Sequence, residues 1–549
     1  MKLLVQKAIL ANILLFISYS LSAGEIKIKI DKRYLNIPVS HKEDRHKMTF
    51  EVKGQPALSV VIRLAPDEAD YWVFKDVSNL KGKTLTISYE GNEKGLSNIY
   101  QDDNIKGEDN LYKENNRPQF HFTTKRGWIN DPNGLVYYDG EYHLFYQHNP
   151  FEREWENMHW GHAVSKDLVH WEELTDALYP DHLGGMFSGS AVIDYGNTAG
   201  YNKGDTPAMI VAYTAAGPDK QVQCIAYSLD KGRTFTKYAN NPVIDSKHIW
   251  NSHDTRDPKI FRYTSGNHWV MVLNERDGHS IYTSPDLKIW KYESHVTGFW
   301  ECPELFELAV DGNSNNKKWV MYGATGTYML GSFDGKTFIP ESGKYFYTKG
   351  SMYAGQTYTN IPDSDGRRIQ IAWGRISHPG MPFNGMMLLP TELTLHTTKE
   401  GIRLFSNPIK ETKQLFAPLK KWASLASDKA NDYLKEFCNA GTLRLKTTFK
   451  LSHATSAGVD FSGQRILDYD MNTNTINGIF YSPEDRNSME LTADIYIDKT
   501  SIEVFIDGGI YSYSMERRTA NNNQDEIHFW GNNISIKNLE VFSVKSIWN

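Results

Sequence analysis

Cysteine is scarce in this chain, which has 549 residues but only Cys224, Cys302 and Cys438. An odd number of widely spaced cysteines excludes the dense disulfide framework that stabilises small secreted domains. One disulfide is compatible with this count, but nothing in the sequence selects a pair. An excess of basic residues is also missing, since 60 Lys and Arg stand against 66 Asp and Glu, giving a net charge of −6. Nucleic-acid binding normally requires a basic surface, so this class of function is disfavoured.

Long hydrophobic runs are missing beyond the first residues of the chain, so we expect no membrane insertion. Lys2 and Lys7 precede an apolar run over residues 8–21, and small residues follow at Ser22, Ala23 and Gly24. This order is typical of a secretory signal peptide, here residues 1–23. No cysteine lies near the cleavage region, which argues against a bacterial lipid anchor. We therefore expect an exported protein, periplasmic in the first instance and otherwise secreted.

Aromatic residues and glycines are abundant, at 13% of the chain and 41 residues respectively. This composition favours short strands and tight turns, whereas patterns of long helices are nearly absent. Residues 24–115 show alternating polar and apolar positions at 26–31 and 84–89. Such alternation predicts half-buried strands, and hence a small N-terminal β module. The polar run 101–117 is interpreted as its exit linker.

An internal repeat marks the middle of the chain. A Ser-x-Asp turn with an aromatic residue shortly afterwards begins at Ser165, Ser228, Ser284 and Ser332, spaced by 63, 56 and 48 residues. Although Ser-x-Asp is a common turn sequence, four copies that each follow a short apolar strand indicate one β-hairpin per repeat. This spacing is typical of propeller blades. We expect a propeller over residues 116–400, with Asp363–Gly366 turning a fifth blade.

The sequence changes in character after the propeller. Residues 401–430 are polar and are interpreted as a linker, and residues 431–549 return to alternation. Strands are expected at 442–447, 501–506 and 534–536, with a hairpin turn at Asp507-Gly508-Gly509. The predicted fold class is therefore all-β: a propeller followed by a C-terminal β-sandwich.

Three acids occur within aromatic, Gly- or Pro-rich segments of the expected propeller. Asp131 lies in Asn130-Asp131-Pro132-Asn133-Gly134, Asp257 in Arg256-Asp257-Pro258, and Glu301 in Trp300-Glu301-Cys302-Pro303. Taken singly, each has a plain structural explanation: a turn, a turn with a surface salt bridge, and a partly buried acid held by a backbone donor. Taken together and in this order, they carry more information.

These three blocks resemble the signature segments of glycoside hydrolase family 32, which contains invertases, inulinases and levanases. The similarity extends from about Pro118 to the C-terminus, through 145–150, 158–163, 187–190 and 353–357. Ile129 stands where many members carry Met. The resemblance implies a five-bladed propeller with a β-sandwich. Residues 24–115 resemble, more weakly, the extra N-terminal domain of Bacteroides fructan hydrolases.

The resemblance also implies chemical roles. Asp131 would be the nucleophile and Glu301 the general acid and then base, while Asp257 would stabilise the transition state. Two carboxyls across the scissile bond are what glycoside hydrolysis requires, and a retaining outcome needs them about 5–5.5 Å apart. Locally, Arg256 favours an ionised Asp257, and Trp300 with Pro303 would exclude water from Glu301.

Further residues follow from the same resemblance. Hydroxyl-binding groups would be Asn130, Gln147 and Arg256, and the walls of the fructose subsite would be Trp155, Phe187, Ser188, Tyr353 and Trp373. For Tyr353 and Trp373, a plain core role fits the sequence equally well. No cofactor or metal is expected, because His159 and His162 flank Trp160-Gly161 in a strand-like segment rather than on a ligand helix.

The expected function is that of a retaining β-fructosidase that releases terminal fructose from fructans of levan or inulin type, from fructo-oligosaccharides and from sucrose. Endo-acting hydrolysis and fructosyl transfer remain alternatives within the same site. Arabinose-directed furanosidases are disfavoured by the Asp131 segment. A different class, a catalytically inactive fructan-binding protein, is disfavoured by the presence of all three acids. The β-2,6 or β-2,1 preference remains open.

Overall fold

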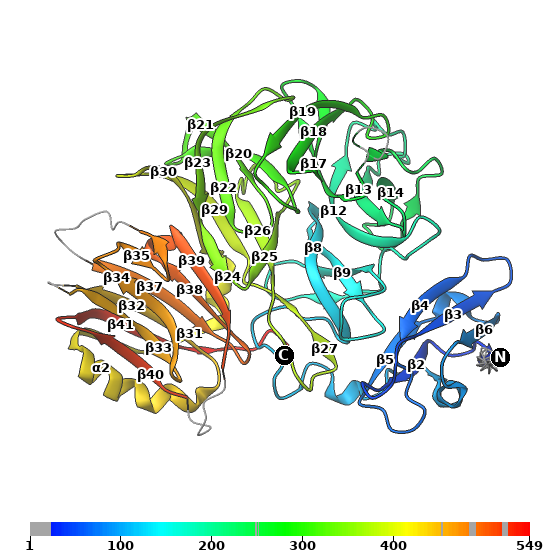
Figure 1. Ribbon diagram of the computed structural model, residues 1–549, viewed down its shortest axis with the longest axis horizontal. Coiled ribbons are helices and arrows are strands. Elements are labelled where there is room, and N and C mark those ends of the chain that lie inside the picture. Colours follow the sequence, from blue (N-terminus) through cyan, green and yellow to red (C-terminus); the bar gives the residue numbers. More distant parts are fainter. Residues whose placement is uncertain are drawn as a thin grey trace, which may run out of the picture.

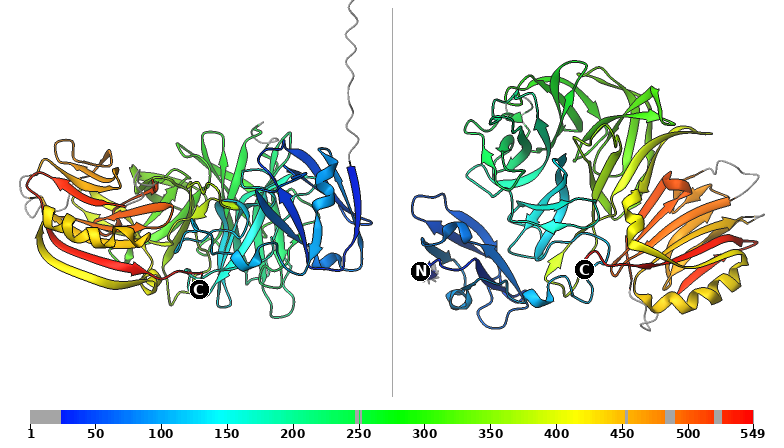
Figure 2. Two further views of the ribbon diagram at one scale, coloured as in Figure 1. Left: turned by 90° about the horizontal axis from the view of Figure 1, so that it is seen from below. Right: turned by 180° about the vertical axis from the view of Figure 1, so that it is seen from behind.

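A computed structural model describes residues 24–246, 250, 252–451, 454–481, 490–518 and 525–548. The expected signal peptide, residues 1–23, lies outside this range. Three bodies lie side by side, with a small N-terminal module and a C-terminal sandwich on opposite flanks of a central ring (Figure 1 and Figure 2). Among the described residues, no helix is long and apolar enough to cross a membrane.

The N-terminal module consists of two small antiparallel sheets. One has the order β1-β6-β3-β4 and the other β5-β2-β7. The strands are β1 Gly24–Lys29, β2 Tyr34–Val39, β3 His46–Val52, β4 Leu58–Ile62, β5 Tyr71–Asp76, β6 Thr84–Tyr89 and β7 Tyr100–Asp102. The two alternating segments predicted from sequence are β1 and β6, and they pair with each other directly. Apolar side chains from both sheets share one core, because alternation turns one face of each strand inward.

The central ring is a five-bladed β-propeller, as predicted. In each blade, the first strand lies nearest the centre and later strands follow outward (Figure 1). Blade 1 contains β8 Gly127–Tyr138, β9 Glu141–Asn149, β10 His159–Ser165 and β11 Glu172–Glu173, and blade 2 contains β12 Gly185–Asp194, β13 Ala208–Ala216, β14 Gln221–Ser228 and β15 Thr236–Lys237. Blade 3 contains β16 Thr255–Tyr263, β17 His268–Glu275, β18 Gly278–Ser284 and β19 Lys291–Thr297. Blade 4 contains β20 Glu304–Val310, β21 Asn313–Tyr322, β22 Thr327–Phe333 and β23 Phe338–Phe346.

The fifth blade closes the ring and is less regular. It contains β25 Met352–Thr357, β26 Arg368–Gly374, β28 Met386–Met387, β29 Thr391–Thr398 and β30 Gly401–Pro408. A single parallel bridge, Val310 to Leu395, joins it to blade 4. On the other side, the short strand β27 Phe383–Asn384 pairs in parallel with β8 of blade 1 at Gly127 and Trp128. A segment of the last blade therefore hydrogen-bonds to the first strand of the propeller.

The sequence repeat corresponds to one recurring turn. Ser165, Ser228, Ser284 and Ser332 end or nearly end the third strand of blades 1 to 4. The Asp two residues later accepts backbone N–H groups of the turn, as Asp167 does from Val169 and His170 at 3.1 and 2.9 Å. Asp363–Gly366 does turn the fifth blade, but it joins the first strand to the second and is not a copy of the repeat.

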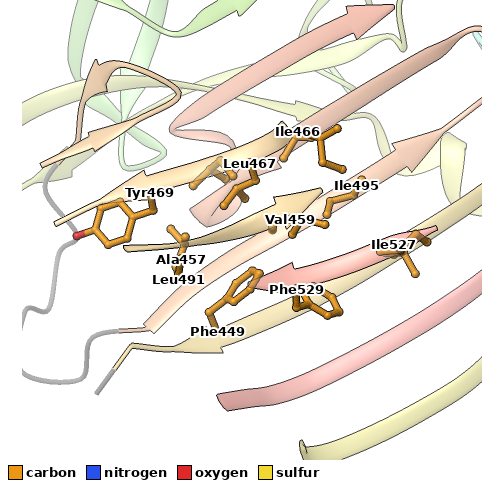
Figure 3. Close-up of a cluster of buried hydrophobic side chains, with 14 of the residues drawn as sticks. Phe449, Ala457, Val459, Ile466, Leu467, Tyr469, Leu491, Ile495, Ile527 and Phe529 are labelled. Carbon is orange, nitrogen blue, oxygen red and sulfur yellow. The ribbon is translucent and has the colours of Figure 1, made fainter. Parts of the chain in front are cut away.

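The C-terminal body is a β-sandwich, also as predicted. One sheet has the order β24-β39-β38-β37-β32-β41-β31 and the other β36-β35-β34-β33-β40. Their strands are β24 Thr348–Gly350, β31 Phe416–Ala426, β32 Leu443–Lys450, β33 Ser456–Phe461, β34 Gln464–Asp470, β35 Thr475–Ile476, β36 Ile479–Phe480, β37 Glu490–Ile497, β38 Ser501–Ile506, β39 Tyr511–Glu516, β40 Ile527–Gly531 and β41 Ser535–Val544. Figure 3 shows side chains of both sheets meeting in the core.

Two segments interpreted as linkers are built into the bodies that they connect. Residues 401–430 form β30 of the propeller, β31 of the sandwich and the start of the helix α2 Ser427–Leu434. In the expected exit linker, Arg117 is fully buried, donates to Glu114 and packs 3.6 Å above the ring of Phe383. The polar residues of these two segments suggested linkers, but they lie on an exposed edge strand in residues 401–430 and in a buried ion pair at Arg117.

Candidate active site

Most of the candidate residues lie at backbone irregularities of the innermost propeller strands. In blades 1, 2, 3 and 5, a register shift interrupts the ladder between the first and second strands. It lies at Asp131, Ser188 and Asp257 in blades 1 to 3, and directly after Tyr353 in blade 5. A β-bulge bends the strand and re-aims its side chains. In blade 4, Glu301 lies three residues before β20. Four register shifts and the segment that precedes β20 thus carry the candidate residues.

Several site residues also occupy the left-handed backbone region. The φ angle is 66° at Asp257, 49° at Glu301, 42° at Cys302 and 53° at Ala354. Residues with a Cβ adopt such angles only where the surrounding structure imposes them, and these positions cluster at functional sites. The conformations accompany the bulges and orient the acids toward the centre.

All eleven residues singled out from the sequence line one cavity of about 330 Å³. They are Asn130, Asp131, Gln147, Trp155, Phe187, Ser188, Arg256, Asp257, Glu301, Tyr353 and Trp373. They come from all five blades although they span 243 positions of sequence between Asn130 and Trp373. Tyr353 and Trp373, for which the sequence allowed a core role, also face this cavity.

Glu301 is held from three sides. Nε and Nη2 of Arg256 donate to its Oε1 at 3.0 and 2.8 Å, and the hydroxyl of Tyr353 donates to Oε2. The backbone N–H of Glu301 donates to Oδ1 of Asn274 at 2.8 Å. Both carboxyl oxygens are therefore fixed before any ligand enters.

Asp131 is positioned by its neighbours in blades 1 and 2. Ser188 Oγ donates to Oδ2 of Asp131 at 2.7 Å, and Asn130 forms a second side-chain hydrogen bond with it. Trp128 Nε1 in turn donates to Oδ1 of Asn130 at 2.8 Å. Burial raises the pKa of Asp131 and the charge of Glu301 adds to this, whereas the hydrogen bonds from Ser188 and Asn130 act in the opposite direction.

Asp257 is buried close to the other two acids. Its backbone N–H donates to Thr214 Oγ1 at 3.0 Å, and its Oδ2 accepts the N–H of Cys302 at 3.0 Å. Burial, followed by the charges of Asp131 and Glu301, raises the pKa of Asp257 to about 7. Arg256 lowers the pKa of Asp257, as expected, but burial and the two like charges outweigh this cation.

Aromatic rings line the cavity around the acids. The rings of Trp155 and Phe187 meet edge to face at 5.9 Å, and those of Tyr353 and Trp373 at 6.3 Å. Such rings can contact the apolar face of a sugar. Trp300, expected to shield Glu301, is instead 42% exposed and lies beneath the guanidinium of Arg256, at 5.7 Å.

The two histidines considered as zinc ligands have other contacts. Nδ1 of His159 is 2.5 Å from the carbonyl oxygen of Asn157, and the ring of His162 stacks on Phe145 at 4.1 Å. In the part of the chain that the structure describes, no group of three or more His, Cys, Asp or Glu side chains is arranged to hold a metal ion.

Sequence reasoning missed several residues that contact the site, among them Cys302, Thr214 and Asn274, which touch the acids. Cys302 Sγ lies 3.8 Å from Oδ2 of Asp131 and 3.6 Å from Oδ2 of Asp257, and it is a free cysteine, as is Cys224. The position of Cys302 between Glu301 and Pro303 could have marked it as a site residue. No sequence pattern marks Thr214 or Asn274, because both lie in second strands of ordinary composition and contact the acids only at their backbone N–H groups.

Comparison with known proteins agrees with this geometry. Residues 121–408 match the family model described as Glycosyl hydrolases family 32 N-terminal domain. A levanase of Bacillus subtilis is 37% identical over 79% of this chain and 71% of its own length. The chain belongs to glycoside hydrolase family 32. It is accordingly a glycoside hydrolase.

Other relatives of this family 32 chain resemble it over a similar extent. An extracellular exo-inulinase of Aspergillus niger is 31% identical over 79% of this chain and 95% of its own. Among solved structures, the exo-inulinase of Aspergillus awamori superposes with a TM-score of 0.68 at 26% identity, covering 80% of this chain and all of that one. A β-fructofuranosidase of Schwanniomyces occidentalis complexed with fructosyl-erythritol gives 0.67 at 26% identity.

Proposed function

We propose that this glycoside hydrolase is a retaining β-fructosidase that releases terminal fructose from levan- or inulin-type fructans, fructo-oligosaccharides and sucrose. The observation that carries the proposal is the gathering of all eleven candidate residues around one cavity of about 330 Å³. Levanases, exo-inulinases and invertases among the relatives support the substrate class. The cavity is at the small end of the roughly 300–1,000 Å³ of ligand pockets, which suits one terminal sugar unit and hence exo action.

In the proposed first step, a carboxylate oxygen of Asp131 attacks C2 of the fructosyl unit. Glu301 gives its proton to the glycosidic oxygen as the C2–O bond breaks, and the leaving group departs as an alcohol. The product is a fructosyl ester of Asp131. The hydrogen bonds from Ser188 and Asn130 hold the attacking carboxylate and favour its ionised form.

In the second step, the ionised Glu301 takes a proton from water as the water oxygen attacks C2. The ester bond to Asp131 breaks, fructose leaves and both carboxyls regain their starting states. Asp257 would bind fructosyl hydroxyls beside the developing positive charge. Trp373 Nε1 has no hydrogen-bond partner within the described residues and is a further candidate donor to a substrate hydroxyl.

Export to the periplasm is proposed as well. It is supported by the order of charged, apolar and small residues at the N-terminus and by relatives named as extracellular enzymes.

The proposal is tested by following products over time on levan, inulin and sucrose in parallel, with Asp131→Asn as the matched inactive control. Free fructose as the only early product supports exo hydrolysis and identifies the preferred linkage. Early oligosaccharides would establish endo action instead, and longer products from sucrose would establish fructosyl transfer. Mass spectrometry of the acid-quenched Glu301→Gln variant, with a fructoside bearing an easily departing aryl group, should show one anhydrofructose unit on the protein.

A further inference from the structure

Trp155 lines the cavity from the loop that joins β9 to β10, residues 150–158. Its side chain is 48% exposed, and its ring contacts that of Phe187 edge to face at 5.9 Å. A side chain exposed to this degree is weakly fixed by its own packing. The place of its indole in the cavity therefore depends on how the backbone of the loop is held.

The N-terminal module holds the residues before Trp155. Phe151 packs in the core of the module, with its ring 5.8 Å from that of Phe50. The Glu152 side chain is 1% exposed, and its Oε2 accepts from Nε of Arg45 and Nη1 of Arg63, both at 3.0 Å. Its Oε1 accepts the backbone N–H of Arg63 at 2.7 Å. A propeller loop thus places a buried acid between two cations of the module.

Acids on either side of Trp155 also contact the module, Glu154 through both arginines and Glu156 through Arg45. Glu154 Oε2 accepts from Nη2 of Arg45 at 2.8 Å and from Nη2 of Arg63 at 3.1 Å. Glu156 lies 4.0 Å from Nη1 of Arg45. Arg45 therefore contacts acids both before and after Trp155, so its position fixes the loop across the tip.

Beyond the tip, the loop pairs with the edge strand β4 of the module. Oδ1 of Asn157 accepts the backbone N–H of Val61, and its Nδ2 donates to the carbonyl of Val61, each at 2.8 Å. Asn157 has a φ of 49°, a conformation that Asn tolerates better than most residues. This amide reproduces the hydrogen bonds of an additional strand.

On the propeller side, the loop rests against fixed backbone. Nδ2 of Asn149 donates to the carbonyl of Glu154 at 2.8 Å, and Nη2 of Arg153 donates to the carbonyl of His378 at 3.1 Å. The loop is consequently held between the module and blade 1, which are neighbours in Figure 1. Buried, hydrogen-bonded charges impose a specific geometry more than they add stability.

We propose that the N-terminal module is a positioning domain, which fixes Trp155 in the substrate cavity through Arg45, Arg63 and Val61. The inference rests on the proposed function and adds a role for the module in sugar binding. Trp155 lines the cavity and contacts Phe187, and no hydrogen bond joins it to Asp131, Asp257 or Glu301 among the described residues, so loosening its loop is expected to weaken substrate binding more than it slows chemistry.

The test is a double-mutant cycle in the full exported chain. Glu152→Gln keeps the shape of the side chain but removes the charge that both arginines contact. We expect KM for sucrose to rise about tenfold with kcat within about twofold, since misplacement of a binding group by one ångström can cost up to two orders of magnitude. In a Trp155→Ala background, which itself raises KM, the same change should alter KM less than about twofold, because the residue through which it acts is gone.

A matched control is Arg33→Met, which breaks an ion pair of the module with Asp76 that does not involve the loop. It should leave KM unchanged. Should Glu152→Gln fail to fold, Asn157→Asp replaces it: Asp tolerates the same backbone angle but cannot donate to Val61. Faster hydrogen exchange of the 150–158 amides should accompany the rise in KM.

Equal effects of Glu152→Gln with and without Trp155 would overturn the positioning role, as would an unchanged KM in Trp155→Ala. Unaltered KM in both loop variants despite faster hydrogen exchange would overturn it too. A wild-type enzyme that cleaves none of the three fructosides would overturn the proposed function itself. That failure is visible before any variant is compared, so the two cannot be confused.

Discussion

The guanidinium of Arg256 donates two hydrogen bonds to Oε1 of Glu301, although its neighbour in sequence is Asp257. A second carboxylate, that of Asp254, also accepts from Nη1 of Arg256. This cation therefore positions the proposed acid and base rather than the transition-state stabiliser. Its fork geometry, and not only its charge, fixes the direction of the Glu301 carboxyl.

Replacing the guanidinium of Arg256 should lower activity even when the positive charge is kept. Arg256→Lys is expected to lower kcat/KM for sucrose about 100-fold, in the range seen when one preorganised donor is removed from an active site. Steady-state kinetics measure it. Arg403→Lys, at a cation that packs over Tyr345 away from the cavity, is the matched control and should remain within about twofold. A similar small effect at Arg256 would show that charge alone suffices.

The hydroxyl of Tyr353 should matter independently of its ring. Tyr353→Phe removes the hydrogen bond to Glu301 while leaving the aromatic wall, so kcat should fall about tenfold with a smaller change in KM. Tyr345→Phe, which alters a tyrosine outside the cavity, provides the comparison. If KM rises and kcat stays constant, Tyr353 serves only as a wall of the subsite.

Asp257 should destabilise the fold at neutral and alkaline pH. Its pKa is raised from an ordinary value of 3.8 to about 7, so the folded state binds this proton more tightly than the unfolded chain. The free energy of unfolding is therefore not reduced by Asp257 below pH 3.8. It falls as the pH rises from 3.8 through about 7, where the folded state loses this proton. The Asp257→Asn variant should thus be more stable than the wild type, by a margin that grows between pH 5 and pH 8 to about 4 kcal/mol.

Thermal denaturation of both proteins across this range is the measurement. Asn keeps an oxygen that can accept the N–H of Cys302, so the native geometry should survive. The variant should also lose activity, because a stabilising change at an acid of the cavity removes charge that the reaction uses. A constant difference in melting temperature from pH 5 to pH 8 would contradict the argument.

A buried histidine joins the propeller to the sandwich. His121 contacts Asp498 and Glu503 at 2.7 Å each, and although its burial acts downward, these two carboxylates raise its pKa to about 9. Its stabilising contribution is complete below pH 6.5 and is lost as the pH rises through about 9. His121→Asn should cost about 3 kcal/mol at pH 6, since it leaves buried carboxylates unpaired.

This cost should shrink above pH 9, where the wild type has lost its imidazolium as well. Chemical denaturation at pH 6 and pH 9.5 measures both differences. The half-exposed pair of His170 with Asp167 supplies the control, and His170→Asn should change stability by less than about 1 kcal/mol. Equal costs of His121→Asn at both pH values would exclude a charged imidazolium at this interface.

The sequence was most informative where chemistry and turns coincide. Asp131, Asp257 and Glu301 lie in short blocks whose order was distinctive, and the Ser-x-Asp turn recurs because its Asp caps backbone N–H groups in four blades. Thr214 and Asn274 were invisible, because their importance arises from strand pairing with distant segments. Such contacts leave no local pattern.

The interpretation of residues 401–430 failed for a different reason. Strand β31 is the outer strand of its sheet, and nearly all of its side chains are exposed. An edge strand with this exposure lacks the alternation that predicts strands, and Pro418 at a register shift further disguises it.

Closure of the ring by β27 has a consequence for biosynthesis. Phe383 and Asn384 pair with Gly127 and Trp128, at the start of the strand that carries Asp131. A chain that ends before residue 383 lacks this pairing, so the strand of the proposed nucleophile keeps an open edge. Synthesis of blade 5 is therefore a condition for a competent site, and early termination products should be inactive and prone to associate through that edge.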